Sequence, residues 1–191
     1  MESRLFQALK AFKGADCCEA NLFKEFKKIA EEAFFSGYFL VNGGCKDAYK
    51  LKLTCIEFYY HEDDGNTKDE KKYLKGKDEF GYALGAVCPN PSGVDVLFDD
   101  PQKKYHASFL IRGYKAIEPG KKEWENNEKR KDWAPHDFWY DLFGGANMLS
   151  NGKFSIEWID ESDETRGYAE PMQRIKINDN RLWGFKRVEK L

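Results

Sequence analysis

The chain has 191 residues, with 31 basic against 33 acidic side chains and a formal net charge of −2. Hydrophobic residues make up 41% and aromatic residues 16%, which excludes disorder as the main state, because disordered chains lack the apolar side chains that build a core. A net charge near zero also argues against bulk electrostatic capture of nucleic acid, so any such surface must come from local charge. The length suits one compact domain.

No apolar run approaches the length of a membrane span, and the segment from Met1 to Gln7 lacks the apolar core of a secretion signal. We therefore expect a cytoplasmic protein with no membrane partner. The five cysteines show no CxxC spacing and the three histidines are scattered singly. The sequence thus predicts reduced thiols and no metal site.

Apolar residues at helical spacing predict a helix over residues 3–13. A second helix follows, with Asn21 as its N-cap and a stop at Gly37. We expect the helical part, residues 1–36, to pack on a sheet formed by residues 37–191, so that both belong to a single domain.

From residue 38 onward the pattern is mostly that of strands joined by turns. Strands are predicted over residues 38–41, 49–60, 81–88, 93–98 and 105–117, then helices over 121–133 and 137–149, a polar loop over 162–170, and a terminal hairpin of 174–178 with 182–186. Pro89 and Pro91 predict a turn between the third and fourth strands, because proline cannot donate to a ladder. Strands in clusters with few crossover helices predict a mostly antiparallel α+β domain.

Two opposite charges each interrupt an apolar strand. Glu57 lies in the run 53–60, which is otherwise suited to burial, and Arg112 interrupts the run 109–114. Because a buried carboxylate is costly unless it is paired, we predict an ion pair between them. Two interpretations are open: the pair only stabilises the fold, or the carboxylate holds and deprotonates a water molecule while the cation orients it.

Basic residues gather in two segments. Residues 101–134 contain nine basic and five acidic side chains and residues 171–191 contain six and two, so each segment carries a net charge of +4. Two such segments on one face would suit nucleic acid, and Lys121, Lys122 and Arg174 are the DNA contacts expected from them. The mixed charges around Lys121 and Lys122 are also typical of a solvated helix face.

Several short motifs occur in a particular order between about residues 25 and 188. They are Ala33-Phe-Phe-Ser-Gly-Tyr-Phe-Leu-Val, Thr54-Cys-Ile-Glu57-Phe-Tyr59, Ser108-Phe-Leu-Ile-Arg112, Asn147-Met-Leu-Ser-Asn-Gly, Pro171-Met-Gln-Arg-Ile-Lys-Ile and Leu182-Trp-Gly-Phe. In number and order they resemble the helix, the Glu-Ala-Tyr motif, the Leu-Leu-Arg strand and the terminal strands of the alkyladenine (3-methyladenine) DNA glycosylases.

This resemblance implies a base-excision repair enzyme on a curved, mostly antiparallel sheet flanked by helices, similar to the barrel of formyltransferase C-terminal domains. It implies a hydrolytic N-glycosylase without metal or cofactor, whose partner is damaged or single-stranded DNA or another nucleobase-containing ligand, with no obligatory protein partner. Glu57 would be the general base, Arg112 would orient its water, Tyr59 would stack on the flipped base, Asp99 would screen the base, and Lys186 would border the pocket.

The family also has a Tyr-Gly pair whose tyrosine wedges into the duplex. Ser92 and Gly93 stand at the matching position, with no aromatic residue before the glycine, and the resemblance implies that they contact DNA. A rival interpretation is a non-catalytic nucleic-acid or nucleobase-binding module that keeps the charge pair for stability. Convergence of the site in an open cleft favours the enzyme, whereas a pair sealed beneath side chains favours the rival.

A third interpretation is a sugar-binding or sugar-hydrolysing protein. It requires Trp124, Trp133 and Trp139 to line one exposed groove. It ranks below the others because no second positioned carboxylate is evident in the sequence.

Overall fold

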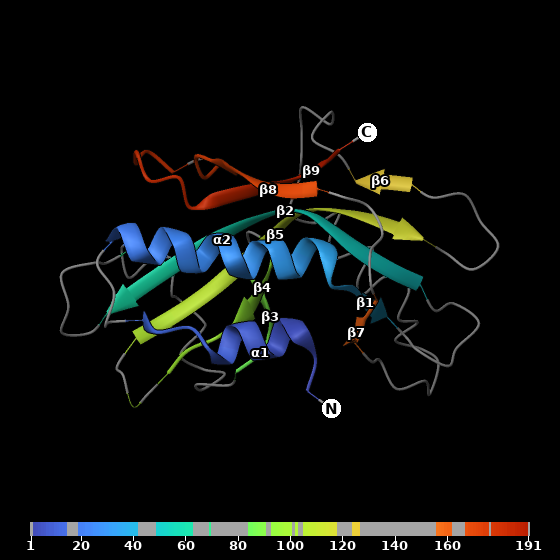
Figure 1. Ribbon diagram of the computed structural model, residues 1–191, viewed down its shortest axis with the longest axis horizontal. Coiled ribbons are helices and arrows are strands. Elements are labelled where there is room, and N and C mark those ends of the chain that lie inside the picture. The colour runs from blue at the N-terminus through green and yellow to red at the C-terminus, as the bar shows by residue number, and fades with distance from the viewer. Residues whose placement is uncertain are drawn as a thin grey trace.

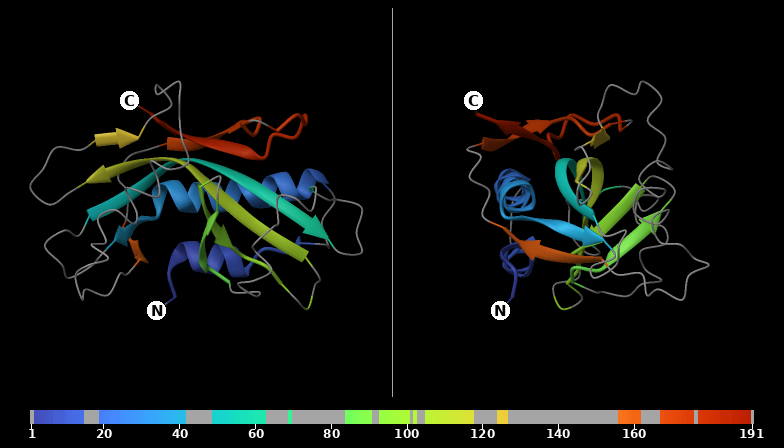
Figure 2. Two further views of the ribbon diagram at one scale, coloured as in Figure 1. Left: turned by 180° about the vertical axis from the view of Figure 1, so that it is seen from behind. Right: turned by 90° about the vertical axis from the view of Figure 1, so that its right-hand side faces the viewer.

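The computed structural model describes residues 2–14, 19–41, 49–62, 69, 84–90, 93–100, 102, 105–117, 124–126, 156–161, 167–175 and 177–190. These residues form two helices and one nine-stranded sheet, with both helices on the same side of the sheet (Figure 1, Figure 2). The α+β class is therefore confirmed. The elements are α1 (Arg4–Lys10), α2 (Glu19–Phe35), β1 (Gly37–Val41), β2 (Tyr49–Glu62), β3 (Val87–Asn90), β4 (Gly93–Leu97), β5 (Tyr105–Ile117), β6 (Trp124–Asn126), β7 (Ile156–Asp160), β8 (Gly167–Met172) and β9 (Gly184–Glu189).

The strands pair in the order β3-β4-β5-β2-β1-β7, while β6 adds to β5, β9 adds to β2 and β8 adds to β9. Every described pair is antiparallel, as predicted. The path has two ends, so the described sheet is open and does not close into a barrel. Neither described helix has the length and apolar character needed to cross a bilayer.

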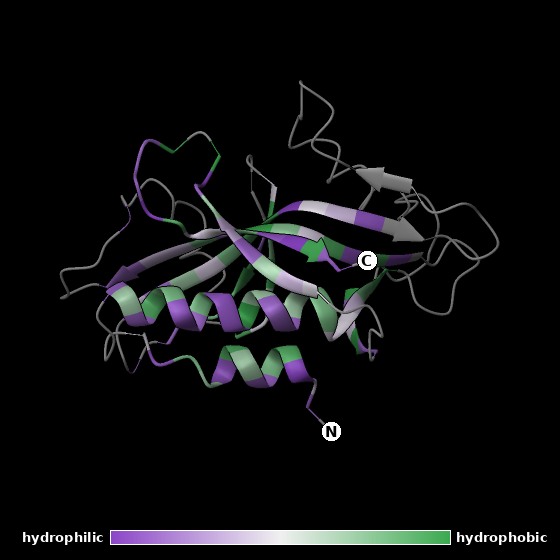
Figure 3. Cartoon of the chain, turned by 45° about the horizontal axis from the view of Figure 1, so that its top comes forward, coloured by the Kyte–Doolittle hydropathy of each residue, from purple (hydrophilic) through white to green (hydrophobic). Residues whose placement is uncertain are grey.

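Both helices begin near the predicted positions. Ser3 caps α1, with its hydroxyl accepting a hydrogen bond from the Phe6 N–H at 3.2 Å. The second helix begins at Glu19, two residues before the predicted cap at Asn21, and ends at Phe35, two residues before Gly37. Its buried residues recur at helical spacing and belong to one core cluster with residues of the sheet. Figure 3 shows hydrophobic and hydrophilic residues following one another in bands along this helix.

A bulge decides which residues of β2 face the helices. The register with β5 shifts on both sides of Cys55, so the extra residue resets the alternation of the strand. Leu53 and Ile56 consequently join the same hydrophobic core, while Glu57 falls on the opposite face. Gly113 lies opposite the bulge, where a Cβ atom would come within 2.7 Å of a β2 side chain.

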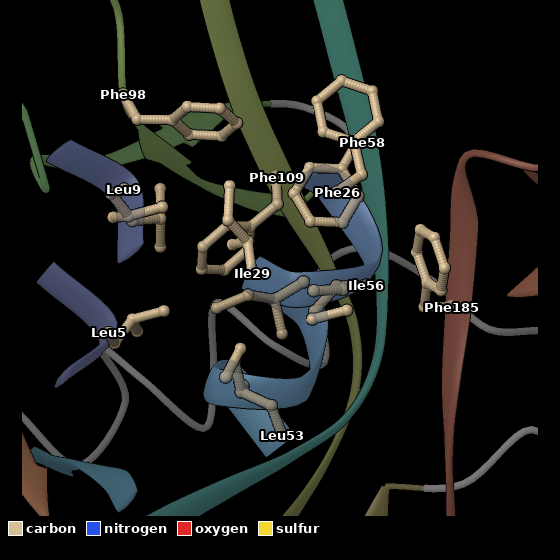
Figure 4. Packing of buried hydrophobic residues seen from close by; sticks show 14 of the residues in the cluster. Leu5, Leu9, Phe26, Ile29, Leu53, Ile56, Phe58, Phe98, Phe109 and Phe185 are labelled. Carbon is tan, nitrogen blue, oxygen red and sulfur yellow. The ribbon is translucent and has the colours of Figure 1, made fainter. Parts of the chain in front are cut away.

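The core between the helices and the sheet is rich in aromatic rings. Phe26 of α2 stacks on Phe58 of β2, with ring centroids 4.5 Å apart. Phe58 also meets Phe109 of β5 and Phe185 of β9 edge-on, so one ring joins three strands and a helix (Figure 4). This packing anchors the central strands that carry the charge pair on their other face.

The C-terminal hairpin differs from its prediction. Its first strand is β8, of which residues 167–170 were predicted as part of a polar loop, while the predicted strand 174–178 belongs to the connection between β8 and β9. In β8 only Ala169 is buried, so the strand lacks an alternating apolar pattern and is held by its pairing with β9. The strand from Gly184 begins two residues later than predicted.

Two further predictions were wrong in detail. Residues 124–126 form a strand paired with β5, not a helix. Pro89 belongs to β3, opposite Val94, although its position predicted a turn. Since β3 is at the end of the strand path, a residue without an N–H is tolerated there. The predicted helix over 137–149 lies outside the described residues.

Candidate active site

The predicted ion pair between β2 and β5 is confirmed. The Arg112 Nε donates to Glu57 Oε2 at 2.7 Å, and Glu57 has no exposed surface. Burial on its own lowers the pKa of the Arg112 guanidinium, but the adjacent Glu57 carboxylate outweighs this effect, so the pKa of Arg112 is raised. The pair is therefore a charge-assisted bond inside the protein.

Two further donors fix the Glu57 carboxylate. The Tyr59 hydroxyl donates to Oε2 at 3.1 Å, from the same face of β2, and the Ile175 backbone N–H donates to Oε1. Burial and then the negative charge of Glu57 raise the pKa of Tyr59, which keeps its hydroxyl protonated as a donor. Both carboxylate oxygens are thus oriented by the protein.

A second buried carboxylate lies on the same side of the sheet. Leu110 of β5 pairs with Glu57 on one side and with Asp95 of β4 on the other, so the three residues form one row across the sheet. Asp95 is 1% exposed and accepts a hydrogen bond from the Ser108 hydroxyl at 2.9 Å. Its charge contributes to the raised pKa of Tyr59. Asp95 was not among the site residues predicted from the sequence, although its place between two valines in β4 is a usable signal.

A four-charge cluster, made of Asp69, Arg174, Asp179 and Arg181, lies next to the pair. Arg174 binds both oxygens of Asp69, at 2.8 and 2.9 Å, and also binds Asp179. Arg181 donates to Asp69 and to Asp179, at 2.7 Å in each case. Burial tends to raise the pKa of Asp179, but the bonds from Arg181 and Arg174 outweigh this, and the pKa is lowered.

This cluster changes the role expected of Arg174. The sequence suggested a DNA contact, but the Arg174 side chain has no exposed surface and its charge is neutralised by Asp69 and Asp179. Its guanidinium also lies 5.0 Å from the centre of the Tyr59 ring. Arg174 therefore supports the site from inside the protein.

Lys186 and Asp99 are the two other residues that were expected to contact a substrate. The residue directly opposite Glu57 on β9 is Gly184, while Lys186 stands opposite Cys55. Asp99 accepts a hydrogen bond from the Ala107 N–H, several positions along β5 from Arg112. The structure brings neither side chain into contact with Glu57.

The structure describes only some of the residues that were expected to contact DNA. Gly93 begins β4 with a φ of 143°, a conformation that favours glycine, and a Cβ atom there would lie 3.0 Å from the Leu110 side chain. Ser92, Lys121 and Lys122 lie outside the described residues. The same holds for Trp133, Trp139 and the side chain of Trp124.

The three central side chains converge, and all three are buried or nearly so. Tyr59 is 5% exposed, and the Arg112 side chain is 9% exposed. One pocket of 580 Å³ lies at the end of α2, where Ser36 and Lys190 are among its lining residues, and it includes neither Glu57 nor Arg112. The enzyme interpretation expected convergence in an open cleft, whereas burial of the pair beneath other side chains is the outcome that favours the rival interpretation.

Comparison with family models, with curated proteins and with solved structures finds no match to this chain. The function of the chain must therefore be inferred from the site itself.

Proposed function

We propose that the chain is a hydrolytic N-glycosylase with Glu57 as its general base, on a curved-sheet fold like that of the alkyladenine DNA glycosylases. One observation carries this proposal: the Glu57 carboxylate is oriented by Arg112, Tyr59 and Ile175. An ionised carboxylate has about four acceptor sites. The described contacts occupy three of these sites, two on Oε2 and one on Oε1. One acceptor site on Oε1 is therefore left for a water molecule.

The reaction needs few groups. The water oxygen attacks the anomeric carbon and forms the new C–O bond, while one of its protons passes to Glu57. The C–N bond breaks, and its electron pair leaves with the base. Arg112 and Tyr59 hold the carboxylate in place during this step, so the protein does not reorganise when charge develops.

The buried pair is poorly explained as a stability device. Taking two charges out of water costs several kcal/mol per ion, so an apolar pair of similar size often gives an equally stable protein. The opposite face of β2 shows that this fold packs apolar side chains well. A carboxylate at position 57 is therefore better accounted for by chemistry.

A second candidate function is a non-catalytic binding module on the same fold. The complete burial of Glu57 favours it, because a substrate reaches this carboxylate only after local displacement of the groups that cover it. In this case the pair fixes the register between β2 and β5 and takes no part in a reaction.

Single-turnover base release separates the two functions. Oligonucleotides carrying hypoxanthine, 3-methyladenine or ethenoadenine are offered as duplex and as single strand. Glu57→Gln is compared with wild type and with Glu62→Gln, a matched control on the same strand whose carboxylate accepts a hydrogen bond from the Tyr60 hydroxyl.

We expect wild type and Glu62→Gln to release base and Glu57→Gln to be slower by about 100-fold or more, the usual contribution of a general base. Release that Glu57→Gln retains would exclude Glu57 as the base. If wild type releases no base from any substrate, the glycosylase proposal fails and the binding module is favoured.

A further inference from the structure

The pocket at the end of α2 combines charges of both signs with an aromatic ring. Its volume of 580 Å³ falls within the usual range of small-molecule sites, about 300–1,000 Å³. The last turn of α2, the first residue of β8 and the residue after β9 line it together with Arg4 of α1 (Figure 1). The pocket therefore collects side chains from both ends of the chain.

Arg4 supplies a fixed positive charge to this pocket. Its Nη2 donates to the Ser36 carbonyl at 2.9 Å and to the Glu161 carbonyl at 3.3 Å. These bonds hold the guanidinium in place without neutralising it, since no carboxylate of the described residues forms an ion pair with it. An arginine has five N–H donors, so donors on Nε and Nη1 are left for a ligand.

Two further charged side chains line the pocket and form no ion pair within the described ranges. Glu32 is half-buried in the last turn of α2, and Lys190 is exposed just after β9. The Lys190 ammonium group lies 5.9 Å from the centre of the Tyr168 ring. Glu31, the other acidic residue of the wall, is already paired with Lys27 at 3.7 Å. With Arg4, the charges available to a ligand are thus two cations and one carboxylate.

An aromatic ring and a buried hydroxyl complete the wall. Phe35 is half-buried, and a Cβ atom on Gly167 would lie 2.5 Å from its ring, so the glycine of β8 makes room for the ring. The Arg187 guanidinium holds this ring from a position 4.7 Å from the ring centre. The Ser36 hydroxyl oxygen is buried and has no hydrogen-bond partner among the described residues. Such a group is rare in native structures, and a polar ligand in the pocket would supply a partner.

We propose that this pocket binds a small zwitterion, an α-amino acid with an apolar side chain. The ligand carboxylate binds Arg4 and Lys190, and the ligand ammonium group binds Glu32. The apolar side chain packs on Phe35. A ligand with a single charge leaves either the two cations or the carboxylate unpaired, whereas a zwitterion pairs with both. The proposal does not depend on the glycosylase function, because the pocket includes neither Glu57 nor Arg112.

Three probes with the same aromatic ring separate the two charged contacts. L-phenylalanine carries both charges, 3-phenylpropionate lacks the ammonium group, and 2-phenylethylamine lacks the carboxylate. Isothermal titration calorimetry on the full chain compares their dissociation constants. We expect L-phenylalanine to bind about tenfold more tightly than either of the others, because each of these lacks one charge-assisted hydrogen bond. No binding of L-phenylalanine, or equal binding of all three probes, would overturn the proposal.

Two variants test the two charged ends of the ligand. Glu32→Gln should weaken binding of L-phenylalanine about tenfold, and Lys190→Gln about threefold, since an exposed ion pair contributes less than a partly buried one. Neither side chain forms an ion pair with a described residue, so we expect both variants to fold like wild type. Glu25→Gln and Lys24→Gln are the matched controls, because both positions lie on α2 with the same degrees of burial and neither lines the pocket.

The controls should bind L-phenylalanine as wild type does. If they weaken binding as much as Glu32→Gln and Lys190→Gln, the effect is one of overall charge and the site is overturned. NMR spectra of the labelled chain locate the ligand independently. The amide signals of Ser36 and Gly167 should shift on addition of L-phenylalanine, and shifts confined to other parts of the chain would contradict the proposal.

Discussion

The two faces of β2 are both buried, yet different forces hold their side chains. On the helix side, Phe58 packs against Phe26 and other aromatic rings. On the opposite side, Glu57 is surrounded by donors and charges, with Arg112 and Tyr59 bound to it. One face relies on apolar area removed from water, and the other on hydrogen bonds and ion pairs between polar groups.

The difference between the two faces of β2 distinguishes the residues that stabilise the fold from those that the proposed function requires. Apolar packing adds stability wherever the side chains fit, whereas a buried charge pair is weak evidence for stability. Residues of the helix-side face should therefore matter for folding alone. Residues of the charged face should matter for folding only when one partner of the pair is removed.

The largest expected effect is on the helix-side face. Phe26→Ala removes a ring stacked on Phe58 and should lower the free energy of unfolding by about 3–5 kcal/mol, through lost burial and the cavity left behind. Urea denaturation measures this change. Phe23→Ala is the control on the same helix, because Phe23 is only half-buried; an equal loss in both variants would show that the core does not depend on the Phe26–Phe58 stack.

The second-largest effect on stability is expected when the ion pair on the charged face of β2 is broken. Arg112→Ala leaves the Glu57 carboxylate buried without its cation, and the free energy of unfolding should fall by about 3 kcal/mol. The double variant Glu57→Leu with Arg112→Met should return to within about 1 kcal/mol of wild type, because apolar pairs often replace buried ion pairs at no cost.

Denaturation of the double variant also tests the two candidate functions. If it is as unstable as Arg112→Ala, the pair is required for folding, which favours the non-catalytic module. A stable double variant that releases no base would place the pair in function and not in folding.

Part of this site could be predicted from the sequence because it leaves a local signal. Glu57 and Arg112 each interrupt an apolar strand, and a buried charge requires an opposite charge nearby. The helices and the long strands were predictable for a similar reason, since an apolar period of 3.6 or 2 is visible over many residues.

The rest depends on contacts that no local pattern contains. The third donor to Glu57 is a backbone N–H 118 residues away, and every residue except proline has such a group. The Asp69–Arg174 pair spans 105 residues and begins in a run with many charges, where no single carboxylate stands out. The bulge at Cys55 reverses the facing of β2, and a strict period of two therefore places Glu57 on the same face as Leu53.

A smaller effect is expected on the pH dependence of stability, through the Tyr59 hydroxyl on the charged face of β2. The pKa of Tyr59 is raised from its ordinary value of 10.0, first by burial and then by Glu57. Below pH 10 the hydroxyl is protonated in both the folded and the unfolded chain, so its contribution to stability is fully present. Above pH 10 the unfolded chain loses this proton while the folded chain keeps it, so stability should fall by up to about 1.4 kcal/mol per pH unit.

Urea denaturation between pH 9 and 11 isolates this contribution when wild type is compared with Tyr59→Phe. Both proteins share the titration of all other groups, so the difference between their slopes belongs to Tyr59. A smaller contribution is expected in a Glu57→Gln background, because the negative charge that helps to raise the pKa of Tyr59 is gone. Equal slopes in wild type and Tyr59→Phe would mean that the hydroxyl is solvated, and that the charged face is more open than its hydrogen bonds indicate.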